Sequence, residues 1–238
     1  MSAFLKMLGA WWGGYIDQTA QTEKFALIDI GWQGTSQCML AQMFPQYDIL
    51  GLYYAVLNEK HPEYKKLGFI NGLEKNFNNH VANAGFLFEN IFLPPIGQVK
   101  SYRENYEGNI EPNLADGVIH NTTVEELQRE VEDFVKDIRK YPYISVPTEK
   151  CISEMYKTID KPSKKMADAL GDIRWTDDGK TIRYVARPTE DLRPAIFHIR
   201  KFLRELKGSG WRTGFLLRTF KIPCNYYYIV TLMRRIMR

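Results

Sequence analysis

A loop with an acid, two glycines and an aromatic residue follows the first apolar run of the chain. This run, Lys24–Trp32, overlaps the start of the sequence DIGWQGTSQ at residues 29–37. In α/β proteins, ligands bind beyond the carboxyl ends of strands, and the N–H groups that open the next helix favour phosphate. Asp29 can bind a hydroxyl group or a metal, and Thr35 or Ser36 can bind phosphate. The segment therefore predicts a ligand site built from Asp29, Gly31, Trp32, Gly34, Thr35, Ser36 and Gln37.

The same loop also fits a purely structural interpretation, a tight strand-to-helix turn in which Thr35 caps the helix. It is neither a dinucleotide fingerprint nor a P-loop, because the glycine spacing differs and no lysine precedes Thr35. It is not a haloacid-dehalogenase nucleophile loop either, since Gly31 stands where a second acid is needed. Trp32, which can stack on a sugar or a base, favours the ligand interpretation.

Glu89 is a second candidate for chemistry because it lies in the otherwise apolar run FLFENIFL. Burial would raise its pKa and suit it to general acid or base catalysis, or it could hold sugar hydroxyls. The alternative is an ion pair with a lysine or arginine. The four histidines show no metal-ligand spacing and the three cysteines no C-x-x-C motif, so no metal site is expected and the cofactor is left unknown.

The C-terminal part of the chain is strongly basic. Residues 192–238 carry a charge of +10, which leaves −6 for residues 1–191 out of a total of +4. Cations interleaved with aromatic residues suit an anionic membrane surface. The predicted membrane contacts are Arg200, Lys201, Arg204, Lys207, Trp211 and Arg212. A nucleic acid is a less favoured partner because the body is acidic and no nucleic-acid motif is present; a third interpretation packs the apolar side of a basic helix on the body.

Length and hydrophobic periodicity predict the elements that must position these residues. With 238 residues, 45% of them hydrophobic and 25% charged, the chain can bury a core. A strand at Lys24–Trp32, a helix ending before Pro45 and a second strand at Asp48–Leu57 form a βαβ unit with parallel strands. The expected fold is α/β, with a Rossmann-like parallel sheet core, a helical second half and a basic amphipathic tail. Its expected divisions are an α/β body at 1–191 and a tail at 192–238.

The second half is predicted to be mainly helical. A helix from Asn121 to about Lys140 carries a capping-box pattern at Thr123 and Glu126. Further helices are expected at Thr148–Ile159 and Pro162–Leu170. A hairpin is expected at 171–187, where an Asp-Gly pair gives the turn signal.

The loop DIGWQGTSQ, followed by GLYYAV, resembles the D-x-G-W-x-G-[ST]-x-Q segment of a bacterial family. These proteins come from capsule and O-antigen gene clusters and are described as haloacid-dehalogenase-like or as glycosyltransferases. Similar segments follow in the same order: FLFENIFLPPIGQVKSY, DFVKDI and KPSKKMADALGDIRW. In longer relatives a phosphatase-like domain precedes this region, so the resemblance is to the distal module alone. It implies roles for Glu89, Pro95, Gly97 and Tyr102 in FLFENIFLPPIGQVKSY.

The resemblance and the loop together predict a protein of surface-polysaccharide biosynthesis. The expected activity is that of a glycosyltransferase or sugar-phosphate transferase module that binds a nucleotide sugar or a phosphorylated sugar. The alternatives are a non-catalytic module that positions a partner transferase, and the remnant of a longer haloacid-dehalogenase-like protein. The expected location is the cytoplasm, with peripheral binding at the inner face of the plasma membrane.

Overall fold

In the computed structural model, the chain forms two compact units. The described residues are 15–16, 18, 22–56, 61–71, 77–92, 99–114, 121–145, 147–176, 181–188 and 199–236. Unit 1 comprises residues 1–75 and 96–118, and unit 2 comprises residues 76–95 and 119–238. This division differs from the boundary expected after residue 191, because the C-terminal helices supply much of the core of unit 2.

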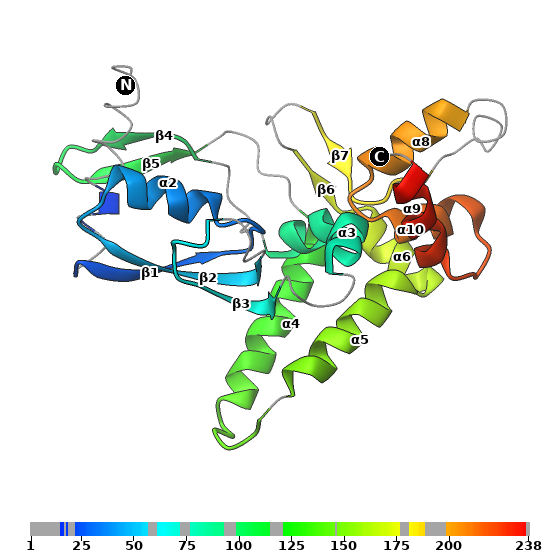
Figure 1. The fold of residues 1–238 in the computed structure, drawn as a ribbon, viewed down its shortest axis with the longest axis horizontal. Helices are drawn as coiled ribbons and strands as arrows, with labels where there is room; N and C mark the ends of the chain where they lie inside the picture. Colours follow the sequence, from blue (N-terminus) through cyan, green and yellow to red (C-terminus); the bar gives the residue numbers. More distant parts are fainter. Residues whose placement is uncertain are drawn as a thin grey trace. The chain divides into compact units, whose positions relative to one another are not determined.

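Unit 1 contains the predicted βαβ unit. The strands β1 (Lys24–Asp29), β2 (Asp48–Val56) and β3 (Lys66–Asn71) form a parallel sheet in the order β1-β2-β3, and the helix α2 (Thr35–Met43) connects the first two (Figure 1). The prediction of parallel strands joined by a helix is confirmed. The order of the described strands follows the sequence, so it contains no reversal of the kind that marks the ligand crevice of a doubly wound sheet.

Alternation of side chains along β2 explains why α2 lies on one face of the sheet. Every second residue of this strand is buried, beginning with Ile49, as expected for a strand with one covered face. Ile49 packs with Leu40 of α2, with Phe44 directly after the helix, and with Ile16. This small core holds the C-terminal half of α2 against the sheet.

Unit 1 also contains a hairpin that the sequence analysis does not predict. Its strands are β4 (Val99–Glu104) and β5 (Ile110–Leu114), which pair antiparallel. In the turn between them, the Asn105 side chain accepts hydrogen bonds from the N–H groups of Glu107 and Asn109. An asparagine that bonds to the following backbone in this way stabilises a turn locally.

Unit 2 is mainly helical. Its described elements are α3 (Phe77–Phe92), α4 (Thr122–Ile138), α5 (Thr148–Asp160), α6 (Lys164–Gly171), the strands β6 (Arg174–Trp175) and β7 (Arg183–Tyr184), α8 (Ile199–Gly208), α9 (Arg212–Phe220) and α10 (Tyr226–Ile236). The predicted helices and hairpin of this region are present. The capping box is wrong: α4 begins after Asn121, so Thr123 and Glu126 lie inside the helix.

The core of unit 2 draws heavily on the basic C-terminal segment. From this segment the buried residues are Phe202, Leu206, Trp211, Phe215, Leu216, Leu217, Tyr226 and Val230. They pack with Leu87 of α3, Ile159 of α5 and Leu170 of α6. The segment is therefore part of a folded unit rather than an appended tail. Within the described part of the chain, no helix is long and apolar enough to cross a membrane.

Candidate functional site

The loop after β1 folds back on its own acid. Asp29 is the last residue of β1, is half-buried, and pairs in register with Tyr53 of β2. The Gly31 N–H donates a hydrogen bond to Asp29 Oδ1 at 2.8 Å, and a Cβ at Gly31 would lie 3.0 Å from that oxygen. The carboxylate is therefore held at the carboxyl end of β1, beside the start of α2.

Gly34, not Thr35, occupies the N-cap of α2. Its φ of 75° is in the left-handed region, which glycine adopts without strain. The first helical hydrogen bond runs from the Cys38 N–H to the Gly34 carbonyl at 3.0 Å. Thr35 and Ser36 are exposed residues of the first turn, so capping by Thr35 is wrong. The N–H groups of this turn have no carbonyl partner within the helix, which leaves a partial positive charge there.

Two residues that the sequence analysis did not select complete this site. The Lys66 side chain, from the start of β3, packs against Gly34: a Cβ on Gly34 would lie 3.0 Å from Lys66 Cδ and 3.8 Å from its Nζ. The Tyr53 hydroxyl would lie 3.3 Å from the same point. Burial, with the negative charge of Asp29, raises the pKa of Tyr53 to about 12. We call Asp29, Gly34, Tyr53, Lys66 and the first turn of α2 the β1–α2 site.

The electrostatics of Lys66 suit an anion. Burial lowers the pKa of its ammonium group, while the negative charges of Glu63 and Cys38 oppose that effect. A partly desolvated cation beside a helix N-terminus attracts a bound anion more strongly than an exposed cation does, because solvent screens the attraction less.

Gln37 is a structural residue, and its predicted role in binding a ligand is wrong. Its side chain is completely buried. The Nε2 amide donates to the carbonyl oxygens of Ile49 at 2.7 Å and Lys65 at 3.0 Å, and Oε1 accepts from the Tyr53 hydroxyl at 3.1 Å. Gln37 thus ties α2 to β2 and to the chain entering β3. Trp32 is half-buried within the loop.

The other predicted site residues lie elsewhere. Glu89 is half-buried on α3, in unit 2, whereas Asp29 belongs to unit 1. Tyr102 is on β4, where its ring lies 5.3 Å from that of Tyr15, and burial raises its pKa. Gly97 lies outside the described residues, as does Pro95.

The predicted membrane contacts separate into exposed and buried residues. Arg200, Lys201, Arg204 and Lys207 form the exposed basic face of α8, opposite the buried Phe202 and Leu206. Trp211 is wrong as a membrane contact, because its side chain is completely buried. Arg212 is half-buried, and burial together with the charge of Arg234 lowers its pKa.

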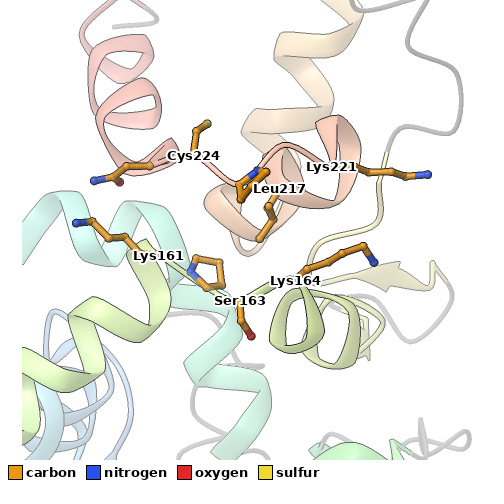
Figure 2. Close-up of a pocket in the computed structure, with 9 residues that line it drawn as sticks. Lys161, Ser163, Lys164, Leu217, Lys221 and Cys224 are labelled. Carbon is orange, nitrogen blue, oxygen red and sulfur yellow. The ribbon is translucent and has the colours of Figure 1, made fainter.

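A pocket of about 480 Å³ lies where α6 begins and α9 ends. It is lined by Lys161, Pro162, Ser163, Lys164, Leu217, Lys221, Pro223, Cys224 and Asn225. Figure 2 shows the Lys161 ammonium group directed to one side and those of Lys164 and Lys221 to the other. Lys164 also pairs with Asp168, and the Ser163 hydroxyl caps α6 by accepting from the Met166 N–H at 3.1 Å. The three cations therefore do not converge on one anion.

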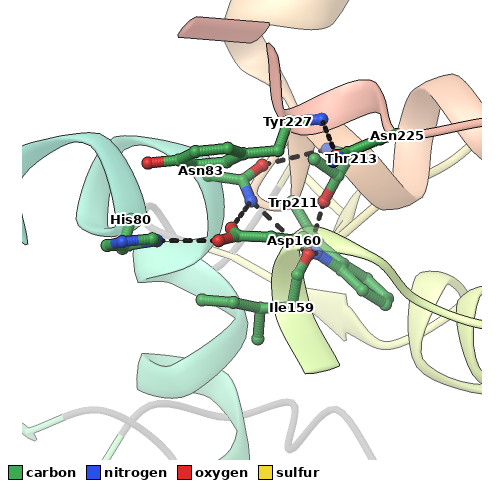
Figure 3. A network of polar contacts seen from close by, with 8 residues as sticks. All are labelled: His80, Asn83, Ile159, Asp160, Trp211, Thr213, Asn225 and Tyr227. Carbon is green, nitrogen blue, oxygen red and sulfur yellow. Dashed lines mark hydrogen bonds and ion pairs between the residues drawn. The ribbon is translucent and has the colours of Figure 1, made fainter. Parts of the chain in front are cut away.

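A network of buried polar side chains connects α3, α5 and α9 (Figure 3). His80 Nδ1 lies 2.9 Å from Asp160 Oδ2, and Asn83 donates to Asp160 Oδ1 at 3.0 Å. Asn83 also accepts from the Thr213 N–H at 3.0 Å, and the Thr213 hydroxyl donates to the Ile159 carbonyl at 2.6 Å.

This network has the chemistry of a core rather than of a catalytic dyad. The His80 ring stacks on Tyr156, with ring centres 3.7 Å apart, and lies 5.1 Å from that of Tyr227. The side chains of His80 and Asp160 are only 10% and 11% exposed. A buried polar network of this kind specifies how helices pack, so we assign it to folding.

Neither a scan against protein-family models nor a search of curated proteins finds a match to this sequence. The resemblance to the capsule and O-antigen proteins therefore stays a prediction. The geometry of the β1–α2 site is the basis on which a function is assigned.

Proposed function

We propose that this chain binds the phosphate of a nucleotide sugar or a phosphorylated sugar at the β1–α2 site, as a glycosyltransferase or sugar-phosphate transferase module of surface-polysaccharide biosynthesis. The observation that carries the proposal is Lys66, whose side chain lies against Gly34 at the N-terminus of α2. A lysine beside the N–H groups of a helix end is a recurrent phosphate-binding arrangement. A Rossmann-like sheet around this site is part of the proposal.

In this proposal each residue of the site has a separate task. The first-turn N–H groups of α2 and the Lys66 ammonium group bind phosphate oxygens, with the exposed hydroxyls of Thr35 and Ser36 beside them. Asp29, held by the Gly31 N–H, accepts a hydrogen bond from a sugar hydroxyl and can take up its proton. Trp32 supplies a surface for the sugar or the base. Glu89, half-buried on α3 of unit 2, stays a separate candidate for acid or base catalysis and has no task at the β1–α2 site.

Replacement of Lys66 by Met is expected to lower phosphate affinity 10- to 100-fold, the usual value of one charge-assisted hydrogen bond. The measurement is titration calorimetry with inorganic pyrophosphate and with a panel of nucleotide sugars. Because burial lowers the pKa of Lys66, wild-type affinity should fall with rising pH earlier than an ordinary lysine would allow.

Lys65→Met is the matched control, since Lys65 is exposed and contributes only its carbonyl oxygen to the contacts of Gln37. Equal affinities of wild type and Lys66→Met would contradict the proposal. Lys66→Met is a cleaner test than Gly34→Val, because a β-branched residue at a φ of 75° is strained whether or not a ligand binds. Transfer of sugar from a bound donor would then separate an enzyme from a binding module or a remnant.

The exposed basic face of α8 supports a second part of the proposal, docking on an anionic membrane surface or on a lipid-linked acceptor. Each basic residue near such a surface contributes about 1 kcal/mol. Changing Arg200, Lys201, Arg204 and Lys207 to Gln should therefore lower binding to phosphatidylserine vesicles at least 100-fold.

The control for this experiment changes Lys136 and Lys140 of α4, which are paired with Asp133 at 2.9 Å and Asp137 at 2.6 Å. Wild-type binding should weaken as salt rises, since charges at the surface are screened over about 8 Å at physiological ionic strength. Unchanged vesicle binding of the variant with the four substitutions would contradict the membrane part of the proposal.

A further inference from the structure

Three side chains with metal-binding chemistry meet beside the β1–α2 site. In the described part of the chain, Cys38 Sγ, one ring nitrogen of His61 and one carboxylate oxygen of Glu63 all lie within 4.8 Å of one another. Cys38 is in the second turn of α2, and the other two are in the turn that precedes β3. None of these residues belongs to the set assigned to phosphate or sugar.

The ligand atoms of His61 and Glu63 are almost as close to each other as two atoms that bind the same ion. His61 Nδ1 and Glu63 Oε1 are 3.7 Å apart, too far for a hydrogen bond. Nitrogen and oxygen ligands about 2.0–2.1 Å from one tetrahedral Zn²⁺ are about 3.3–3.4 Å apart. A closure of a few tenths of an ångström would bring these two atoms to that separation, and Cys38 Sγ lies within 4.8 Å of both.

The three side chains differ in burial in a way that suits metal binding. Cys38 is 6% exposed, and its sulfur accepts a hydrogen bond from Gln42 Nε2 at 3.3 Å. The side chains of His61 and Glu63 are 34% and 54% exposed, so an ion can enter from their side.

The backbone at His61 is unusual for a residue with a side chain. Its φ of 50° is in the left-handed region, and the Tyr64 N–H donates to its carbonyl at 3.2 Å to close the turn. This conformation costs free energy for a residue other than glycine. The turn that adopts it is the one that brings both His61 and Glu63 toward Cys38.

We propose that Cys38, His61 and Glu63 bind a divalent transition-metal ion of the Zn²⁺ class. Thiolate and imidazole ligands select Zn²⁺ and Co²⁺ over Mg²⁺ and Ca²⁺. Three protein ligands leave a fourth position for water or substrate, as in catalytic rather than structural zinc sites. This departs from the expectation drawn from spacing, and it does not require the phosphate proposal to hold.

The test is titration of the metal-free protein with Co²⁺, whose bond to a thiolate gives a charge-transfer band in the near ultraviolet. We expect one Co²⁺ per chain, displaced by Zn²⁺, and a melting temperature that rises with Zn²⁺. Cys38→Ser should abolish the band. His61→Ala and Glu63→Gln, at more exposed positions, should keep the fold and weaken Co²⁺ affinity at least tenfold.

The control variant Cys224→Ser removes an exposed thiol in unit 2 and should leave the band unchanged. A band that survives Cys38→Ser, the absence of any band, or unchanged affinity in both His61→Ala and Glu63→Gln would each overturn the proposal. If Cys38→Ser does not fold, the His61 and Glu63 variants decide the outcome alone. Lys66→Met should retain the band, so loss of phosphate binding and loss of metal binding can be told apart.

Discussion

Deletion of residues 208–238 is expected to unfold unit 2 rather than leave a folded body. The deleted segment contains Trp211, Phe215 and Leu216, whose side chains are 0%, 3% and 1% exposed. Burial of each such side chain contributes about 1.5–3 kcal/mol, and a whole domain is stable by only about 5–15 kcal/mol. Circular dichroism should show loss of helix, and limited proteolysis should cleave α3 and α5, which pack on this segment.

A single substitution tests the same point without truncation. Trp211→Ala is expected to destabilise unit 2 by about 3–5 kcal/mol, because it leaves a cavity and removes the indole donor of the 2.8 Å hydrogen bond to the Ile159 carbonyl. Tyr228→Ala, at a side chain that is 71% exposed, should change stability by no more than about 0.5 kcal/mol. A truncated protein that still melts cooperatively with wild-type helix content would contradict this assignment of the segment to the core.

The C-terminal segment shows which part of a fold periodicity can predict. An apolar stripe with cations on the opposite face, as in α8, has the same spacing whether the stripe faces a membrane or a protein core. Only the partners of the stripe decide between them, and these are supplied by helices far away in the sequence, such as α3 and α5. The βαβ unit was predictable because two short apolar runs, a glycine turn and a short helix are all local signals. The short strands gave no such signal, because β3 (KLGFIN) contains lysine, glycine and asparagine and β4 (VKSYRE) is mostly polar.

The residues of the candidate site also differ in whether the sequence alone predicts them. Asp29 and Gly34 were predictable, because a strand end followed by a glycine-containing helix start is visible in the sequence. Tyr53 and Lys66 were not, because they reach the site only through the pairing of β2 with β1 and β3. Gln37 was misassigned because its residue type suits a ligand, while its position on the inner face of α2 makes it a core residue. Cys38 and His61 were not predicted as neighbours, because they approach each other only when the turn before β3 folds.

The close approach of Gly51 to Gln37 predicts a strong and non-additive effect on stability. A Cβ at Gly51 would lie 2.3 Å from Gln37 Oε1 and 2.4 Å from Tyr53 Cε2. Gly51→Ala is therefore expected to destabilise unit 1 by about 2–3 kcal/mol through overpacking. Gln37→Ala should cost a similar amount, about 2–4 kcal/mol, because it removes three hydrogen bonds, to two carbonyl groups and one hydroxyl, and empties a buried site.

In the double variant the two losses should not add. Removal of the Gln37 side chain relieves the contact with Oε1, and it frees the Tyr53 ring, whose hydroxyl it holds, to move away from the new Cβ. The combined destabilisation should therefore fall short of the sum by at least about 1 kcal/mol in urea unfolding followed by circular dichroism. Gly208→Ala is the control, since nothing lies within 4 Å of a Cβ at that position. Strict additivity would show that Gln37 does not fill the space above Gly51. Gln37 also bonds to the carbonyl of Lys65, the residue before Lys66. Gln37→Ala should therefore also weaken pyrophosphate binding, because Lys66 is then held less firmly although the residue itself is unchanged.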